Sequence, residues 1–494
     1  MKTSRLHTGI STLGARASTI FAPVAGRVRA TLLGLGLAIG LACGAGAQTN
    51  WVLLSYAPSQ PGNPLKGLMP TCGSAASLAG FPHSLQYVNF SISNVMASPS
   101  ITAANVLGAG TNYFNWSTNK GLEYWIADAT NDGCQLVARP YLDFPGMPTG
   151  IPNYLITNGL AILNYTADGG GVCPNYADTN MVNAMVSFIT AFGAKYDGDP
   201  RIAFVEAGVL GQWGEWHCDG DSLSWWPPLA TQQAVLTAYA NAFKKTKVLV
   251  RYPSGTNNLY SGHPMEEDDY RPFGYHDDSF VYDTVCMFMP AMTNVGAQAL
   301  NKWINYPIGG QMWPNYSASV WTNPPSSNNL GQSFVGCVEL THATYMLDTS
   351  VFAAGWSNTT GYANSLVGTW ALGYEFSVES LGAWVDAGSG ASMVGVTITN
   401  TGAAPFYYNW PVQLAAANPQ GQIIQTWSPG WALTNIYPGS GTAQLSTALT
   451  NPPAGAFTLL MRVVNPLPNG RVLRFANTTQ DQTVRGWLTL GTFD

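Results

Sequence analysis

The chain has 494 residues, of which 46% are hydrophobic and only 9% are charged, and its net charge is −6. An average soluble protein carries about 25% charged residues, so the surface here must consist mainly of neutral hydrogen-bonding groups. Such a surface suits an uncharged polar ligand such as a sugar. The negative net charge excludes the basic footprint of a nucleic-acid-binding protein, and the length predicts one large domain with a smaller one, or two to three domains.

The N-terminal region, residues 1–47, has the features of a secretory signal peptide. It contains basic residues and no acid, then an apolar run at 31–42, then Ala-Gly-Ala at 45–47. This order predicts cleavage after Ala47 and a secreted protein, extracellular or periplasmic. A lipid-anchored start at Cys43 is an alternative that Gly40 disfavours. The apolar run is too short to span a membrane, and the mature chain has no other predicted transmembrane segment.

Cysteine spacing also fits an exported protein. The six cysteines that follow the signal are Cys72, Cys134, Cys173, Cys218, Cys286 and Cys337. No CxxC occurs, which disfavours a zinc cluster or a thioredoxin-like site. We therefore predict structural disulfides in an oxidising compartment, with the pairing open, and no metal or cofactor.

From residue 84 onward, apolar strand-like segments alternate with amphipathic helices. Strands are predicted at 84–92 and 134–143, with a helix at 121–133 between them. A helix at 179–193 follows, with its apolar residues on one face and Gly193 at its end. Alternation of this kind predicts βα units and a parallel sheet.

The same alternation continues to about residue 372. A strand at 202–210, a helix near 230–245 and a strand at 248–253 are followed by three strand-and-loop candidates, at 273–284, 307–314 and 335–342. About eight units over some 300 residues predict a (β/α)8 TIM-type barrel across 48–372 rather than an open sheet. No GxGxxG opens a helix, which disfavours a nucleotide-binding fold.

The composition changes near residue 373. From there to Asp494 the chain is rich in Thr, Val, Gly, Asn and Pro, and it contains alternating stretches such as SMVGVTITNTG and FTLLMRVVN. Little of it has helical periodicity. Residues 373–494 are therefore predicted to form an all-β sandwich.

Six motifs carry a resemblance to a known family: NPLKGL (63–68), ARPYLDFPG (138–146), YDGDPRIAF (196–204), GEWH (214–217), HDDSF (276–280) and APFYYNWPV (404–412). In this order they resemble secreted bacterial proteins that carry the domain of unknown function numbered 4832, often with a companion N-terminal domain numbered 4874. The resemblance covers nearly all of the mature chain. It implies a glycoside-hydrolase-type barrel followed by a β-sandwich, and a Glu where IGGQMWP has Gln311.

The segment GQWGEWH, residues 211–217, holds the leading catalytic candidate. Glu215 follows a predicted strand, lies between Trp213 and Trp216, and precedes His217. The two indoles could desolvate the carboxyl and raise its pKa, as a general acid/base requires, and an indole also offers a platform for a sugar ring. The alternative is a structural glutamate in an aromatic loop.

The partner of Glu215 is open, because glycoside hydrolysis usually needs two carboxyl groups. Gln311 lies where a second acid could face Glu215, but an amide cannot act as a carboxylate nucleophile. Three explanations compete: Asp277, Asp278 or Asp143 supplies the second acid; the reaction is substrate-assisted, with Gln311 orienting a substrate amide; or the barrel only binds glycan.

The HDDSF motif is the second polar cluster. In a regular strand, His276 and Asp278 would point inward together while Asp277 turns away. The alternative is a buried polar network beneath the site. The acidic stretch at 266–269 lacks calcium-loop spacing and is predicted to be a solvated loop.

Further sugar-binding candidates come from other strand ends: Arg139, Tyr141, Asp143, Trp313 and His342. Arg139 with Asp143 either binds substrate or braces the barrel rim. Arg251 is predicted to brace the rim through an ion pair, and Glu206 to be a polar residue of the barrel interior.

Taken together, these features predict a secreted glycoside hydrolase acting on an oligo- or polysaccharide, with Glu215 as general acid/base and no cofactor. A non-catalytic glycan-binding or cell-surface protein on the same barrel is the alternative. A Ser-His-Asp hydrolase is disfavoured, because no GxSxG elbow lies on a strand-to-helix turn.

Overall fold

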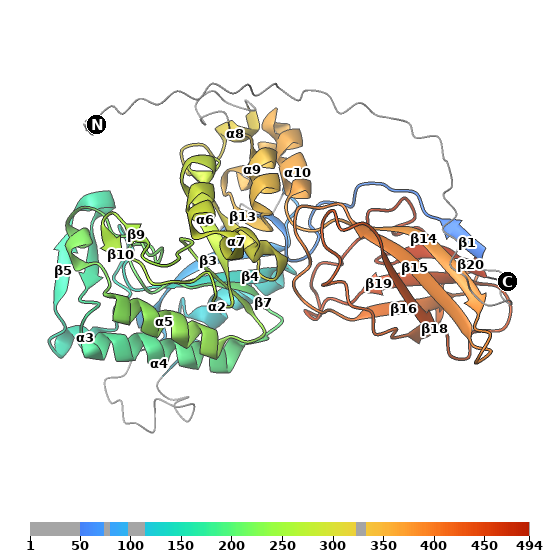
Figure 1. Cartoon of the computed structure of the whole chain (residues 1–494), viewed down its shortest axis with the longest axis horizontal. Coiled ribbons are helices and arrows are strands. Elements are labelled where there is room, and N and C mark those ends of the chain that lie inside the picture. The colour runs from blue at the N-terminus through green and yellow to red at the C-terminus, as the bar shows by residue number, and fades with distance from the viewer. Residues whose placement is uncertain (1–49, 74–79, 97–113, 323–331, 494) are drawn as a thin grey trace. The chain divides into compact units, whose positions relative to one another are not determined.

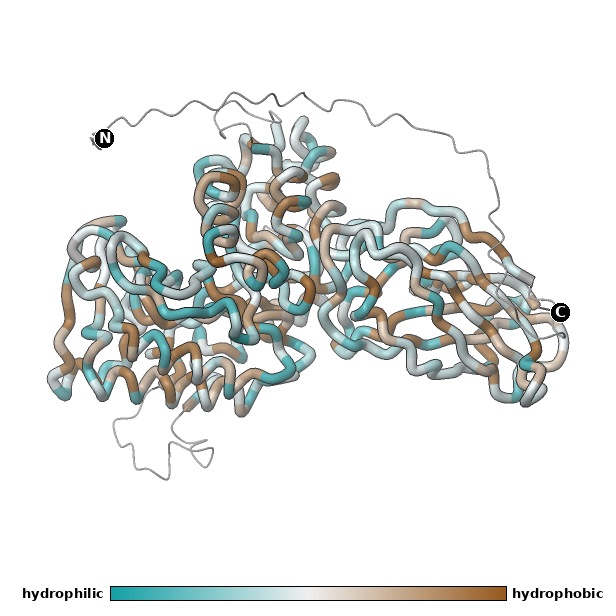
Figure 2. Tube along the Cα trace, in the orientation of Figure 1, coloured by the Kyte–Doolittle hydropathy of each residue, from teal (hydrophilic) through white to brown (hydrophobic). Residues whose placement is uncertain are grey.

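The computed structural model describes residues 50–73, 80–96, 114–322 and 332–493 (Figure 1). The predicted signal peptide and Cys43 lie outside these residues. The chain from Ala47 to Asp494 forms one compact unit. Within the described ranges, no helix has the length and apolar character needed to cross a membrane. Figure 2 shows apolar residues recurring at intervals along helices and strands rather than in long runs.

An eight-stranded parallel sheet forms the first part of the chain. Its strands follow one another in chain order: β2 (Gly67–Met69), β3 (Leu85–Ser91), β4 (Gln135–Tyr141), β7 (Ile202–Glu206), β8 (Lys247–Val250), β11 (Phe273–Phe280), β12 (Ile308–Met312) and β13 (Tyr345–Leu347). β13 pairs with β2, and a parallel bridge from Thr71 to Tyr87 joins the end of β2 to β3. The sheet is therefore a nearly closed barrel, as predicted.

Helices follow most of the strands: α2 (Leu122–Asn131), α3 (Asn153–Thr157), α4 (Thr179–Tyr196), α5 (Leu229–Ala242), α6 (Met289–Val295), α7 (Ala297–Leu300), α8 (Ser319–Thr322), α9 (Phe334–Thr341) and α10 (Gly361–Ala371). Asp178 caps α4 by accepting hydrogen bonds from the backbone N–H groups of Asn180 and Met181. The predicted end of this helix at Gly193 is wrong. Gly193 lies inside α4, where a Cβ would lie 2.5 Å from the Cβ of Ala242, so the glycine permits close approach to α5.

A second correction concerns residues 335–342, predicted as strand and loop. They form α9, which the Ser333 side chain caps by accepting a hydrogen bond from Gly336 N. A short apolar run fits a helix and a strand equally well. The final barrel strand is the next segment along the chain, β13. Two short hairpins lie in the loops of the barrel. One pairs β5 (Ile162–Tyr165) with β6 (Gly171–Pro174), and the other pairs β9 (Leu259–Tyr260) with β10 (His263–Pro264).

The C-terminal part consists of two four-stranded antiparallel sheets. One contains β1 (Asn50–Leu53), β14 (Phe376–Val385), β15 (Ser392–Asn400) and β18 (Ala443–Ala448), and the other β17 (Ile423–Trp427), β16 (Val412–Ala417), β19 (Phe457–Val463) and β20 (Leu488–Phe493). β1 pairs with β14, so residues 50–53 join this all-β part although the sequence places them before the barrel.

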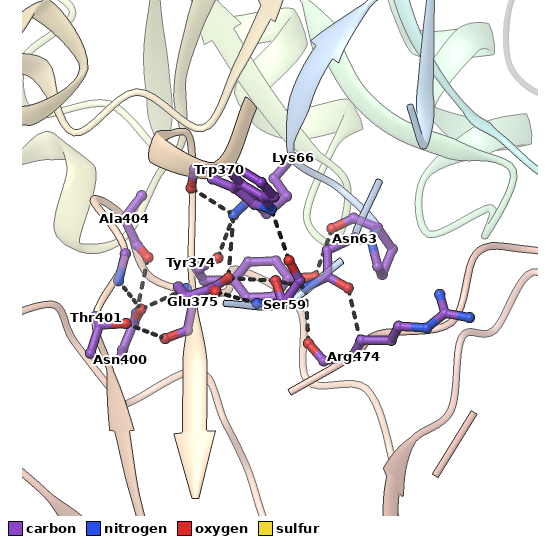
Figure 3. Close-up of polar contacts among 12 residues, drawn as sticks. Ser59, Asn63, Lys66, Trp370, Tyr374, Glu375, Asn400, Thr401, Ala404 and Arg474 are labelled. Atoms are coloured by element: carbon purple, nitrogen blue, oxygen red, sulfur yellow. Dashed lines mark hydrogen bonds and ion pairs between the residues drawn. The ribbon is translucent and has the colours of Figure 1, made fainter. Parts of the chain in front are cut away.

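A buried polar network ties the segment before β2 to the start of the all-β part (Figure 3). The Lys66 ammonium donates to Tyr374 O at 2.7 Å and lies 4.0 Å from Glu375 Oε2. Glu375 in turn accepts hydrogen bonds from the backbone N–H and hydroxyl of Ser59, at 2.8 and 2.6 Å. Burial lowers the pKa of Lys66 to about 8, while Glu375 opposes the shift.

The predicted disulfides are not seen. The six cysteines of the described residues, from Cys72 to Cys337, are all free thiols, and four of them are buried. Burial raises the pKa of Cys134 to about 12, so this side chain behaves as a small apolar core residue.

Candidate active site

A cavity of about 550 Å³ lies at the carboxyl ends of the barrel strands, where enzymes of this architecture place their sites. Its walls come from several consecutive βα loops. The lining residues central to the chemistry are Asn89, Phe144, Trp213, Glu215, His217, Arg251, Asp278, Gln311 and Trp313.

The loop after β7 turns back sharply and carries Glu215 over the barrel mouth. Val209, Trp213 and Trp216 have φ values of 73°, 56° and 54°, in the left-handed region that non-glycine residues seldom adopt. Backbone bonds from Trp216 N to Leu210 O and from Gln212 N to His217 O hold the turn. Such strain is sustained where the surrounding structure fixes it, as at functional sites.

Arg139, on β4, is the hub of the site. Its guanidinium reaches three carboxylates: Glu206 at 2.7 Å, Glu215 at 2.6 Å and Asp278 at 2.9 Å. A second guanidinium, that of Arg251, lies 2.6 Å from Asp278. Arg251, predicted only to brace the rim, also lines the cavity.

The three carboxylates of this cluster differ in exposure and in electrostatics. Arg139 and Arg251 face them, and His276 lies 2.9 Å from Asp278. The Glu215 side chain is 10% exposed, against 1% for Glu206 and 2% for Asp278, and only Glu215 and Asp278 line the cavity. Burial raises the pKa of Glu215 to about 7, and the negative charge of Asp278 adds to the rise.

Asp278 has the opposite electrostatics. Burial alone would raise its pKa, but His276, Arg139 and Arg251 together hold the pKa well below its usual range. One carboxyl poised near neutrality beside one that stays ionised is the arrangement of an acid and a charge-stabilising partner. Arg139 Nη1 binds Glu215 while Nη2 binds Asp278, so the two carboxylates lie side by side on one guanidinium.

The other acids considered as partners point elsewhere. Asp277 accepts hydrogen bonds from the Thr284 hydroxyl at 2.7 Å and Ser279 N at 2.9 Å, and Asp143 accepts one from the Tyr165 hydroxyl at 2.6 Å. Neither lines the cavity around Glu215. Burial raises the pKa of each to about 6.

The HDDSF strand has the alternation expected from its sequence. His276 Nδ1 lies 2.9 Å from Asp278 Oδ1, and Asp277 faces the other way. His276 is fully buried and therefore contributes to the network beneath the cavity rather than to its wall.

Aromatic side chains form much of the cavity wall. Phe144, Trp213 and Trp313 all line it. The ring of Trp313 stacks on Tyr282 with centroids 4.9 Å apart, and Tyr316 stacks on Tyr282 at 5.4 Å. Because this stack fixes the indole, it can serve as a rigid platform for the apolar face of a sugar.

His217 adds a neutral imidazole to the same wall. Burial lowers its pKa to about 4, with Arg251 adding to the effect. Its Nδ1 lies 2.5 Å from the Tyr260 hydroxyl. A neutral imidazole has one N–H donor and one acceptor nitrogen. If Nδ1 accepts from Tyr260, Nε2 can donate to a ligand; if Nδ1 donates to Tyr260, Nε2 can accept from one.

Three predicted sugar contacts need correction. Trp216 belongs to the core, where its indole N–H donates to Ala207 O at 2.6 Å. Tyr141 is buried, with its ring beside that of Phe144, and does not line the cavity. His342 precedes β13 and so lies at the opposite, amino end of the strands, where it stacks on Trp303 and bonds Ala403 O.

No group of His, Cys, Asp and Glu side chains in the described ranges has an arrangement that could hold a metal ion.

No protein-family model matches the chain, so its membership of the family with domain 4832 stays a prediction. No curated protein matches it either. Among solved structures, endo-glycoceramidase II from Rhodococcus sp., as its lactosyl-enzyme intermediate, is 13% identical with a TM-score of 0.41, over 80% of this chain and all of that one. Cel5A of Thermotoga maritima with cellobiose is 11% identical, with a TM-score of 0.32, over 62% and 96% of the two chains.

The α-amylase of Geobacillus thermoleovorans with acarbose is 6% identical, with a TM-score of 0.30, over 79% of this chain and 97% of that one. Likeness at this level carries no information about activity.

Proposed function

We propose that this protein is a glycoside hydrolase acting on an oligo- or polysaccharide, with Glu215 as its general acid/base. The observation that carries the proposal is the pairing of Glu215 and Asp278 on the Arg139 guanidinium at the cavity wall. Three carboxylates share two guanidiniums, and the pKa of Glu215, at the cavity wall, is raised to about 7. A carboxyl that is half protonated near neutrality matches the demand of glycosidic bond cleavage.

In the first step, Glu215 gives its proton to the glycosidic oxygen as the bond from that oxygen to the anomeric carbon breaks. Arg139 Nη1, 2.6 Å from Glu215, then stabilises the new carboxylate. Asp278 stays ionised and offsets the positive charge that develops on the sugar ring. In the second step, the Glu215 carboxylate takes a proton from the attacking water.

A non-catalytic glycan-binding protein is the second candidate, and Gln311 is the observation that favours it. Gln311 lines the cavity from the end of β12, and no acid from that strand accompanies it. The aromatic wall would bind sugar equally well in a protein without turnover.

Reducing-sugar release from a broad glycan panel tests the proposal. We expect release by the wild type and a loss of about 10²- to 10⁴-fold in Glu215→Gln, with glycan binding kept. Glu339→Gln, on the exposed face of α9, is the matched control and should behave as wild type. If the wild type and Glu215→Gln both bind a glycan and neither releases sugar, the protein binds glycan without cleaving it, and the proposal is wrong.

We also propose that residues 1–47 direct export. N-terminal sequencing of the protein recovered outside the cytoplasm tests this, with a start at Gln48 as the expected result. A start at Met1 would contradict it.

A further inference from the structure

The end of β12 presents an amide and an aromatic ring to the cavity. Gln311 and Trp313 both line it, and residues two apart along an extended segment point to the same side. Within the described part of the chain, neither a side chain nor a backbone group hydrogen-bonds the Gln311 amide. Its donor and acceptor are therefore available to a ligand.

The same wall lacks a free carboxylate for attack on the anomeric carbon. Asp278 is held by two guanidiniums and His276, and its side chain is only 2% exposed. The remaining acids of the lining, Asp168 and Asp219, lie on exposed loops, and Asp219 caps a 3-10 turn by accepting from Gly220 N at 2.7 Å. Glu215 can act as the acid, but no free carboxylate on the β12 side of the cavity accompanies it. The group that attacks the anomeric carbon is therefore unassigned.

We infer that the substrate itself supplies the nucleophile. The sugar at the cleavage point carries a 2-acetamido group, whose carbonyl oxygen attacks the anomeric carbon while Gln311 Oε1 accepts the N–H of the same group. This inference rests on the proposed function of Glu215 and names its substrate class. An acetamido group combines a methyl with an amide, which matches the pairing of the Trp313 ring with the Gln311 amide.

The bonds balance in two steps. First, the acetamido oxygen forms a bond to the anomeric carbon, the bond from that carbon to the leaving oxygen breaks, and the leaving oxygen takes the Glu215 proton. The product is a five-membered oxazolinium ring fused to the sugar. Water then attacks the anomeric carbon, Glu215 takes one water proton, and the ring opens to restore the acetamido group.

Matched pairs of p-nitrophenyl glycosides test the substrate class. Each pair shares a sugar configuration and anomer and differs only in a 2-acetamido or 2-hydroxyl group. We expect the wild type to cleave one acetamido glycoside at least about 100-fold faster than its 2-hydroxyl counterpart, because the latter lacks the nucleophile. The thiazoline analogue of the fused-ring intermediate should inhibit competitively.

Gln311→Ala tests the residue. It should lower kcat on the acetamido glycoside by about 10- to 100-fold, the size expected for one hydrogen bond to a group that gains charge, and weaken thiazoline inhibition by a similar factor. Gln298→Ala, at an exposed position of α7 and outside the cavity lining, is the matched control. Unchanged near- and far-ultraviolet circular dichroism shows that each variant folds.

Several results would overturn the inference. One such result is equal cleavage of both members of every pair. Another is inactivation by a 2-deoxy-2-fluoro glycosyl fluoride, which traps a protein nucleophile, combined with no inhibition by the thiazoline. Both leave Glu215 as the acid, so they refute the acetamido step alone. Turnover of neither member of any pair, together with none on the glycan panel, refutes the proposed function and this inference with it.

Discussion

Replacing Glu215 by Gln is expected to remove a pH-dependent loss of stability. Burial and the charge of Asp278 raise the pKa of Glu215 from 4.5 to about 7. Between these values the native state binds more protons than the unfolded state, so the free energy of unfolding falls as pH rises. A difference of this size corresponds to about 3 kcal/mol across the window. The amide of Gln does not titrate and can still accept a hydrogen bond from Arg139.

Urea unfolding followed by tryptophan fluorescence measures this, at about pH 4 and about pH 8. We expect Glu215→Gln to gain about 3 kcal/mol on wild type between the two conditions, and Glu339→Gln to follow the wild type. A stability difference that is the same at both pH values would show that Glu215 has an ordinary pKa. The electrostatic basis for Glu215 as a proton donor near neutral pH would then be wrong.

Three further substitutions test other parts of the account. Arg139→Leu strips buried carboxylates of their cation and should destabilise the protein by about 3–5 kcal/mol, measured by urea unfolding; a loss under about 1 kcal/mol would contradict the hub role. Trp313→Ala should raise KM on the best glycan about 10-fold, as expected for a lost stacking contact, and unchanged kinetics would remove the ring from the sugar site. Lys66→Met leaves Glu375 buried without its cation and should cost about 2–4 kcal/mol near neutral pH. Because the pKa of Lys66 is lowered from 10.5 to about 8, wild-type stability should also rise with pH in this interval, and a wild-type curve that is flat there would refute the shift.

Much of the barrel could be predicted from sequence, because its strands and long helices have strong periodicity. The helix near 179–193 and the strands near 134–143 and 202–210 all appear close to the predicted places. Two failures have local causes. Residues 335–342 form too short an apolar run to separate helix from strand, and Gly193 has a packing reason inside α4 that sequence does not reveal.

The site could be predicted only in part. The position of Glu215 after a strand and the alternation of HDDSF predict Glu215 and Asp278 as site residues, and both line the cavity. The sequence does not predict that Arg139 binds three carboxylates at once, because those carboxylates come from strands and loops far apart in the chain. The prediction that His342 binds sugar is wrong because it takes residues 335–342 as a strand. The last strand is β13, and His342 precedes it, so the residue lies at the amino ends of the strands.

The dependence of rate on the leaving group tests the central claim, that Glu215 is the proton donor, most directly. Wild type and Glu215→Gln would be compared on aryl glycosides of one sugar whose leaving phenols differ in acidity. In kcat/KM, which reports the bond-breaking first step, we expect the variant to lose about 10²- to 10⁴-fold on a weakly acidic leaving group and little on dinitrophenolate, which needs no proton. An equal loss on every leaving group would contradict it and would reduce Glu215 to a residue that shapes the cavity.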